Sequence, residues 1–163
     1  WFIFFSMLYY LRLRRLYMQE LEMKNFIPQT EARLLKLNYD VLPISVGTTV
    51  NLTVQDEVNI TKVEKNSITF ECSRNLVMDP KSIFEAKATC FIKRSIDPKL
   101  AEEIDLTSYD GLNEFIQHNL ANLVNTAFAN MSYIFASITS SFGGAPFITP
   151  SIPTPNTRII RKI

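Results

Sequence analysis

The chain has 163 residues, which suits one domain, and 47% of them are hydrophobic, enough for a single core. A net charge of +1 gives no electrostatic footprint for nucleic acid, and 20% charged residues do not fit a disordered chain. Two cysteines and one histidine argue against a disulfide scaffold and a dedicated transition-metal site.

Residues 1–22 differ from the rest of the chain. Their apolar run is too short for a membrane span, and their arginines follow the run instead of preceding it as in a signal peptide. The codons of Gln19 and Glu20 can hold a purine-rich ribosome-binding sequence just before Met23. We interpret residues 1–22 as translation of upstream DNA or as a disordered leader, and expect a cytoplasmic domain that begins at Met23.

The first half alternates apolar and polar residues at period two, which predicts half-buried antiparallel strands. Short polar connections at 64–66 and 79–80 predict hairpin turns between the later strands. The apolar positions are Leu35, Leu37, Tyr39 and Val41; Val50, Leu52, Val54, Val58 and Ile60; Ile68, Phe70, Cys72 and Leu76; and Phe84, Ala86, Ala88, Cys90 and Ile92.

One charged pair interrupts the apolar face of the second and third strands. If Val63 lies opposite Ser67 at the turn, the same register places Asp56 opposite Arg74. The acid and the base on this stripe would then meet as a cross-strand ion pair. The alternative is that both residues lie at the edge of the face.

Two cysteines fall on the core faces of the third and fourth strands. A turn centred on Lys81 places Cys72 opposite Cys90, whereas a turn centred on Pro80 offsets them. In a reducing cytosol we expect two small buried apolar residues rather than a disulfide.

Apolar residues between Leu112 and Ile138 recur every three or four positions, which predicts a long helix. Gly143 and Gly144, followed by Pro146, end it. No Asp, Glu, Lys or Arg occurs from residue 115 to residue 157. A neutral helix face of small side chains suits burial in a homo-oligomer; biased codon composition is the alternative. After the helix, prolines predict an extended apolar segment that continues into a flexible basic tail at 153–163.

The order of strand, three-stranded meander, long helix, Gly/Pro break and apolar end is similar to the SecB family of export chaperones, especially its divergent SecB-like members. Two stretches carry the resemblance, residues 119–134 and residues 140–147, within a domain expected at 23–152. The resemblance implies an α+β fold, in which a four-stranded antiparallel sheet carries the long C-terminal helix on one face. It also implies dimers or tetramers in which helices lie between sheets.

The resemblance further implies an ATP-independent holdase that binds unfolded polypeptides or preproteins for export, without cofactor, metal, catalytic residues, nucleic acid or stable membrane insertion. Phosphate-loop, GxSxG and HExxH motifs are absent from the sequence. We expect exposed apolar patches near the end of the helix and in the segment after it. The candidate polypeptide-binding residues are Phe128, Tyr133, Phe135, Phe142, Phe147, Ile148 and Ile152.

Delivery to SecA is in doubt, and two other interpretations stay open. Well-known SecB proteins are acidic and engage the translocation ATPase SecA, so the neutral charge and basic tail here argue against delivery to SecA. A dedicated chaperone or interaction module could serve one client, such as an antitoxin, by adding a strand to the sheet edge. A carrier could enclose a small apolar ligand between sheet and helix.

Overall fold

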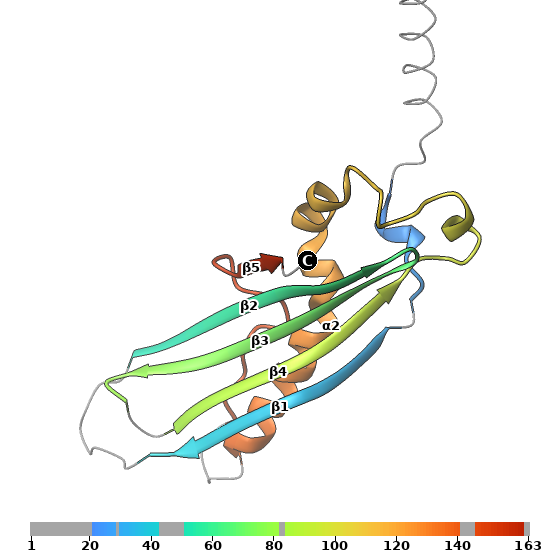
Figure 1. Ribbon diagram of the computed structural model, residues 1–163. Coiled ribbons are helices and arrows are strands. Elements are labelled where there is room, and N and C mark those ends of the chain that lie inside the picture. Colours follow the sequence, from blue (N-terminus) through green and yellow to red (C-terminus); the bar gives the residue numbers. More distant parts are fainter. Residues whose placement is uncertain (1–20, 29, 43–50, 82–83, 141–145, 162–163) are drawn as a thin grey trace, which may run out of the picture.

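The computed structural model describes residues 21–28, 30–42, 51–81, 84–140 and 146–161, and the account below concerns these residues. They form a five-stranded sheet in the order β1-β4-β3-β2-β5, with a long helix across one face (Figure 1). Neighbouring strands are antiparallel except β2 and β5, which are parallel. The elements are η1 (Met23–Asn25), β1 (Glu31–Val41), β2 (Asn51–Glu64), β3 (Ser67–Asp79), β4 (Phe84–Ser95), η2 (Leu100–Glu102), α2 (Leu112–Ser140) and β5 (Arg158–Arg161). The predicted α+β architecture, with four main antiparallel strands and one long helix, is confirmed.

The register of β2 and β3 brings Asp56 opposite Arg74, as the alternation predicts. At the turn the prediction is wrong by one residue, because Val63 pairs with Ile68 and not with Ser67. The reason is an irregularity at Thr61, where β2 carries one residue more than β3. The bulge shifts the phase of the alternation by one residue, and only three residues of β2 follow it before the turn, so the sequence pattern did not reveal it.

A second bulge changes which leucine of β1 lies on the helix side of the sheet. The pairing of β1 with β4 shifts between Leu34 and Lys36, so Leu34 lies opposite Cys90 and Leu37 opposite Ala88. The prediction placed Leu35 in this row, and the structure puts Leu35 in the bulge instead. The row on the helix side therefore contains Leu34, not the residue after it.

The core lies between the sheet and α2. Alternate residues of β3 and β4 are buried on the helix side, and α2 buries a continuous stripe along its 29 residues. Phe26 extends the core at the start of the helix, where its ring stacks on Phe115 with centroids 5.7 Å apart. Leu21 is also buried, and its N–H donates to the Tyr109 hydroxyl over 3.1 Å. Packing thus reaches back to Leu21, whereas a translation start at Met23 stays a prediction because residues 1–20 lie outside the described part.

Two buried arginines hold the C-terminal third of the chain against the sheet. Arg94 on β4 donates from Nε to the Leu123 carbonyl over 2.7 Å and from Nη2 to the Asn122 carbonyl over 2.9 Å. A further hydrogen bond goes to Oδ1 of Asn125. Burial lowers the pKa of Arg94, since few water molecules reach its guanidinium. The main chain of α2 thereby serves as the acceptor that a carboxylate would otherwise provide.

The second arginine forms the ion pair that the register predicted. Arg74 and Asp56 are fully buried at the side chain, with Nε to Oδ1 at 2.7 Å and Nη2 to Oδ2 at 2.8 Å. The guanidinium carbon also lies 4.7 Å from the centre of the Phe128 ring. The alternative, in which both residues sit at the edge of the apolar face, is wrong. Buried charges need good geometry and further hydrogen bonds, and this pair has both.

The basic end of the chain is not the flexible tail that its composition suggested, at least up to residue 161. Arg158–Arg161 forms β5, a parallel strand on the free edge of β2, with Ile159 opposite Val58. Two adjacent isoleucines suit a strand, and the outer edge of β2 offers the unpaired main-chain groups that such a strand requires.

Replacing Arg74 with methionine should lower the free energy of unfolding by about 3–5 kcal/mol, because Asp56 would remain as an unpaired buried charge. Replacing both residues, as in Arg74→Met with Asp56→Leu, should recover part of this loss. Urea unfolding followed by circular dichroism measures both values. Equal losses in the single and double variants would contradict a coupled pair.

The two cysteine thiols should be unreactive in the folded protein. Cys72 lies opposite Cys90, as a turn centred on Lys81 requires, and both are free and buried. Burial raises the pKa of Cys90 to about 11 and raises that of Cys72 further, so neither forms a thiolate at pH 8. A chromogenic disulfide reagent should therefore report fast labelling of two thiols only after denaturant is added. Fast labelling of the native protein would show that the β3–β4 face opens readily.

Candidate polypeptide-binding surface

Strand β1 carries an apolar row that the rest of the described chain leaves uncovered. The row faces the helix side of the sheet, but α2 packs chiefly over β3 and β4. Leu34 is 44% exposed, Leu37 is 36% exposed and Val41 is 58% exposed, and Leu35 in the bulge is open too. Because β1 lies at the end of the strand order, its outer main-chain groups have no strand partner among the described residues.

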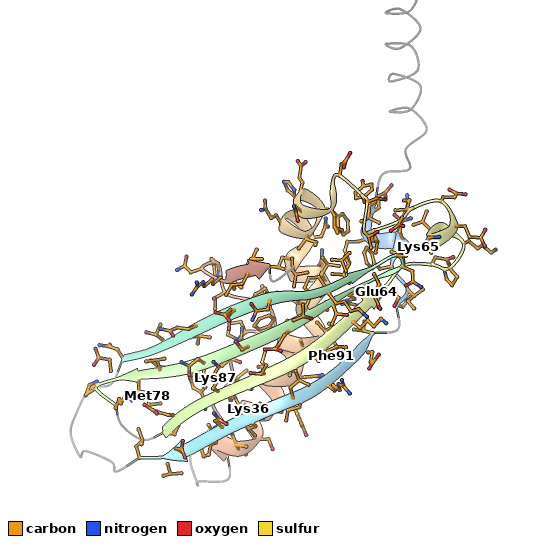
Figure 2. The ribbon with its side chains drawn as sticks, viewed as in Figure 1. Lys36, Glu64, Lys65, Met78, Lys87 and Phe91 are labelled. Atoms are coloured by element: carbon orange, nitrogen blue, oxygen red, sulfur yellow. The ribbon has the colours of Figure 1, made fainter. Side chains whose placement is uncertain are left out.

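The other face of the sheet is of a different kind. Lys36, Lys87 and Phe91 project from the side turned away from α2 (Figure 2). The Arg33 guanidinium lies 4.8 Å from the centre of the Phe91 ring. Charged side chains make this face a solvated surface, so the apolar surface is confined to the helix side.

Residues 146–157 form an extended segment that we call the strap. It runs beside α2 on the helix side of the sheet and ends at β5 (Figure 1). It begins at the end of α2, where the Phe147 N–H donates to the Thr139 hydroxyl over 2.8 Å. Farther along, the Ser132 hydroxyl donates to the Thr149 carbonyl. Two hydroxyl side chains of α2 thus hold the first half of the strap through main-chain groups of the strap.

The Arg74–Asp56 pair holds the second half of the strap. Arg74 donates from Nη1 to the Pro150 carbonyl, and from Nη2 to the Ile152 carbonyl over 2.9 Å. Nη1 also reaches the Thr149 hydroxyl at 2.9 Å. Asp56 Oδ2 accepts the Thr154 N–H over 2.8 Å. The strap thus bonds to the N–H groups of Arg74 and the carboxylate oxygen of Asp56 that have hydrogen-bonding capacity left after the ion pair has formed.

Three of the predicted polypeptide-binding residues are on the surface. Tyr133 on α2 is 76% exposed, and Ile148 and Ile152 on the strap are 73% and 53% exposed. Phe147 is half-buried, with its ring centre 6.4 Å from that of Phe84. Exposed apolar surface was predicted near the end of the helix and in the following segment, and these side chains are exposed there.

Two other predicted residues, Phe128 and Phe135, are buried within the subunit. Phe128 and Phe135 have no exposed surface, since Phe128 packs beneath Arg74 and Phe135 lies in the buried stripe of α2. Within one subunit these two rings therefore belong to the core. Phe142 lies outside the described residues.

Sequence reasoning missed the β1 row as a surface and Arg74 as an anchor for the strap. The row was recognised as a strand face, but nothing in the pattern shows that the helix leaves it uncovered. For the arginines a signal was present. Arg74 and Arg94 occupy the buried parity of their strands, among apolar residues, where a charge needs a dedicated partner.

The described residues give little support for a small-ligand pocket or a metal site. Hollows on the outer side of β2 and beside β3 and β4 are lined mainly by polar and charged side chains. The described residues contain no group of three or more His, Cys, Asp or Glu placed to hold a metal ion. Among the described helices, none is long and apolar enough to span a membrane.

Comparison with known proteins gives a structural likeness without a sequence match. Neither a protein-family model nor a curated protein matches the chain. The Mycobacterium tuberculosis SecB-like chaperone Rv1957, solved in complex with a ChAD peptide from the Rv1956 HigA1 antitoxin, superposes with a TM-score of 0.56 at 10% identity over 75% of this chain and 88% of that one. A protein of unknown function from Streptococcus agalactiae superposes with a TM-score of 0.45 at 12% identity, over 75% of this chain and 97% of that one. At this level of identity the likeness concerns the fold, and the fold of this chain is SecB-like.

Proposed function

We propose that the protein is an ATP-independent chaperone that holds unfolded polypeptides against the helix side of its sheet. The observation that carries the proposal is the uncovered apolar row of β1, with Leu34, Leu37 and Val41 exposed on a SecB-like fold. Tyr133 and the strap isoleucines add exposed apolar surface. Monomeric proteins rarely leave such residues together without a partner.

The chemistry of this surface suits weak and unselective binding. Each apolar side chain that a client covers contributes roughly 25 cal/mol of binding free energy per Å² of buried apolar area, whatever the client sequence. The open edge of β1 can also hydrogen-bond a client main chain as an added strand. Such a site has no requirement for nucleotide, and the sequence has no phosphate-binding loop.

We propose that the neutral face of α2 is a surface for self-association into a dimer or tetramer in the cytoplasm. The exposed side chains of this face include Asn122, Ala129 and Ser137, and it carries no charge from residue 115 onward. A solvated helix normally carries charged residues on its outer face. Small neutral side chains allow another helix to approach closely.

A second candidate function is that of a dedicated chaperone for one client, such as an antitoxin. It is favoured by the similar M. tuberculosis structure, whose partner is an antitoxin peptide. A role in protein export would require a translocation partner that binds a neutral chaperone. A net charge of +1 does not suit an acidic SecA-binding surface. The polar linings of the two hollows on the sheet do not favour the carrier hypothesis.

Replacing both row leucines, as in Leu34→Ser with Leu37→Ser, should weaken binding of unfolded polypeptide by about tenfold or more, because each lost leucine contact removes about 1 kcal/mol. The measurement is suppression of aggregation of a chemically denatured test protein, without nucleotide, at near-stoichiometric amounts. Light scattering on the same samples reports the oligomer mass, which separates loss of assembly from loss of client contact.

The matched control is Lys36→Ser with Asn38→Ser, which changes the other face of the same strand. It should suppress aggregation as well as the unchanged protein does. If the unchanged protein fails to suppress aggregation of any test protein, a general holdase is wrong and the dedicated client becomes the favoured function. Equal activity of the leucine variant would remove the β1 row from the site.

A further inference from the structure

Most hydrogen bonds that hold the strap involve its main chain, while the Thr149 hydroxyl and the Phe147 ring add two side-chain contacts. Five of the six hydrogen bonds described above that join the strap to α2 and to the Arg74–Asp56 pair use main-chain carbonyls or N–H groups of residues 147–154, and the sixth uses the Thr149 hydroxyl. Its two isoleucines, Ile148 and Ile152, point into solvent. A polypeptide of different sequence in the same extended conformation would present the same main-chain groups.

Arg74 and Asp56 would be left with unpaired buried groups if nothing occupied the place of the strap. Arg74 uses Nη1 and Nη2 to reach strap atoms, and Asp56 uses Oδ2 to accept the Thr154 N–H. If the strap left and nothing replaced it, buried donors of a guanidinium would lose their acceptors, which is strongly unfavourable. A chain that displaces the strap must therefore supply carbonyl groups at the same places.

The attachment of the strap beyond this anchor is limited. β5 contributes a four-residue parallel pairing with residues 57–60 at the edge of the sheet. Prolines at 150, 153 and 155 have no N–H, so the strap itself cannot form a regular ladder with β2. A short edge strand and a few polar contacts are the kind of attachment that opens locally while the core stays folded.

We propose that the Arg74–Asp56 pair is a recognition site for the main chain of an extended polypeptide, and that the strap is its internal occupant, which a client chain displaces. The inference rests on the proposed function and adds a second contact region, remote from the β1 row. Because the strap is tethered, it competes at a high effective concentration, and clients bind only as tightly as its release permits. Unfolded chains of sufficient length then have an advantage over short apolar molecules.

A reversible lock on the strap tests this in the full-length protein. Glu57 and Arg158 lie opposite one another in the β2–β5 register and line the same hollow, so Glu57→Cys with Arg158→Cys can form a disulfide. The disulfide would fix β5 at Arg158, and the other end of the strap is joined to α2 by the chain. The strap would then be held over the Arg74–Asp56 pair. The native Cys72 and Cys90 are buried and stay out of the reaction.

The probe is fluorescent, reduced and carboxymethylated α-lactalbumin, a permanently unfolded polypeptide, titrated against the oxidised and the reduced variant. Oxidation should weaken binding by about tenfold or more, and reduction should restore it, because release of the strap limits binding. The matched control is Asn38→Cys with Lys87→Cys, an opposite pair on the outer face of β1 and β4, for which oxidation should change nothing.

Each outcome decides between the hypotheses. Equal binding by the oxidised and reduced forms would overturn the inference and leave the proposed function standing. Loss of binding on oxidation of the control pair as well would also overturn it, since the strap would not be the cause. If the reduced variant and the unchanged protein both fail to bind the probe, the proposed function falls and the inference falls with it.

A direct readout follows the strap itself. A nitroxide attached at Ile152→Cys, which is exposed, should become more mobile in electron spin resonance spectra when the unfolded probe is added. A nitroxide at Lys65→Cys, in the exposed β2–β3 turn, should not change (Figure 2). An Ile152 label that stays immobile under saturating probe would show that the strap remains in place, against the inference.

Discussion

A buried guanidinium must find acceptors, and the placement of the C-terminal third of this chain depends on that requirement. Arg74 sits in the middle of the apolar side of β3, where Asp56 neutralises its charge but uses only part of its hydrogen-bonding capacity. The strap supplies the remaining acceptors through its carbonyls. This explains how a segment with four prolines, poor in main-chain donors, can cover part of a sheet: the contacts that hold it use mainly the carbonyl groups that proline retains.

The same principle positions the helix. Arg94 on β4 meets carbonyl oxygens of Asn122 and Leu123 in α2, so both arginines bind main chain rather than relying on carboxylates alone. Cations buried in this way fix the register of one element on another, since only a few carbonyls lie within reach. The apolar stripe of α2 supplies the hydrophobic stabilisation, whereas the arginines restrict where along the sheet the helix and strap can lie.

The sequence pattern was sufficient for the strands, the helix and the central pairing of Asp56 with Arg74, because each depends on a period that apolar residues display directly. It was insufficient at the Thr61 and Leu35 bulges, where one extra residue shifts by one position which side chains face the helix. The helical period placed Phe135 on the apolar stripe and Tyr133 off it, and the structure shows the first buried and the second exposed. The period could not show that the helix leaves the β1 row exposed or where the strap lies, because both are long-range consequences of the fold.

The pairing of β5 with β2 gives the sheet two unlike edges. β5 occupies part of the β2 edge, whereas β1 offers an unpaired edge along its length among the described residues. β5 interrupts the β2 edge at residues 57–60, whereas the β1 edge runs without interruption from Glu31 to Val41. An extended segment that pairs with the sheet would therefore find its longest continuous row of main-chain groups at β1.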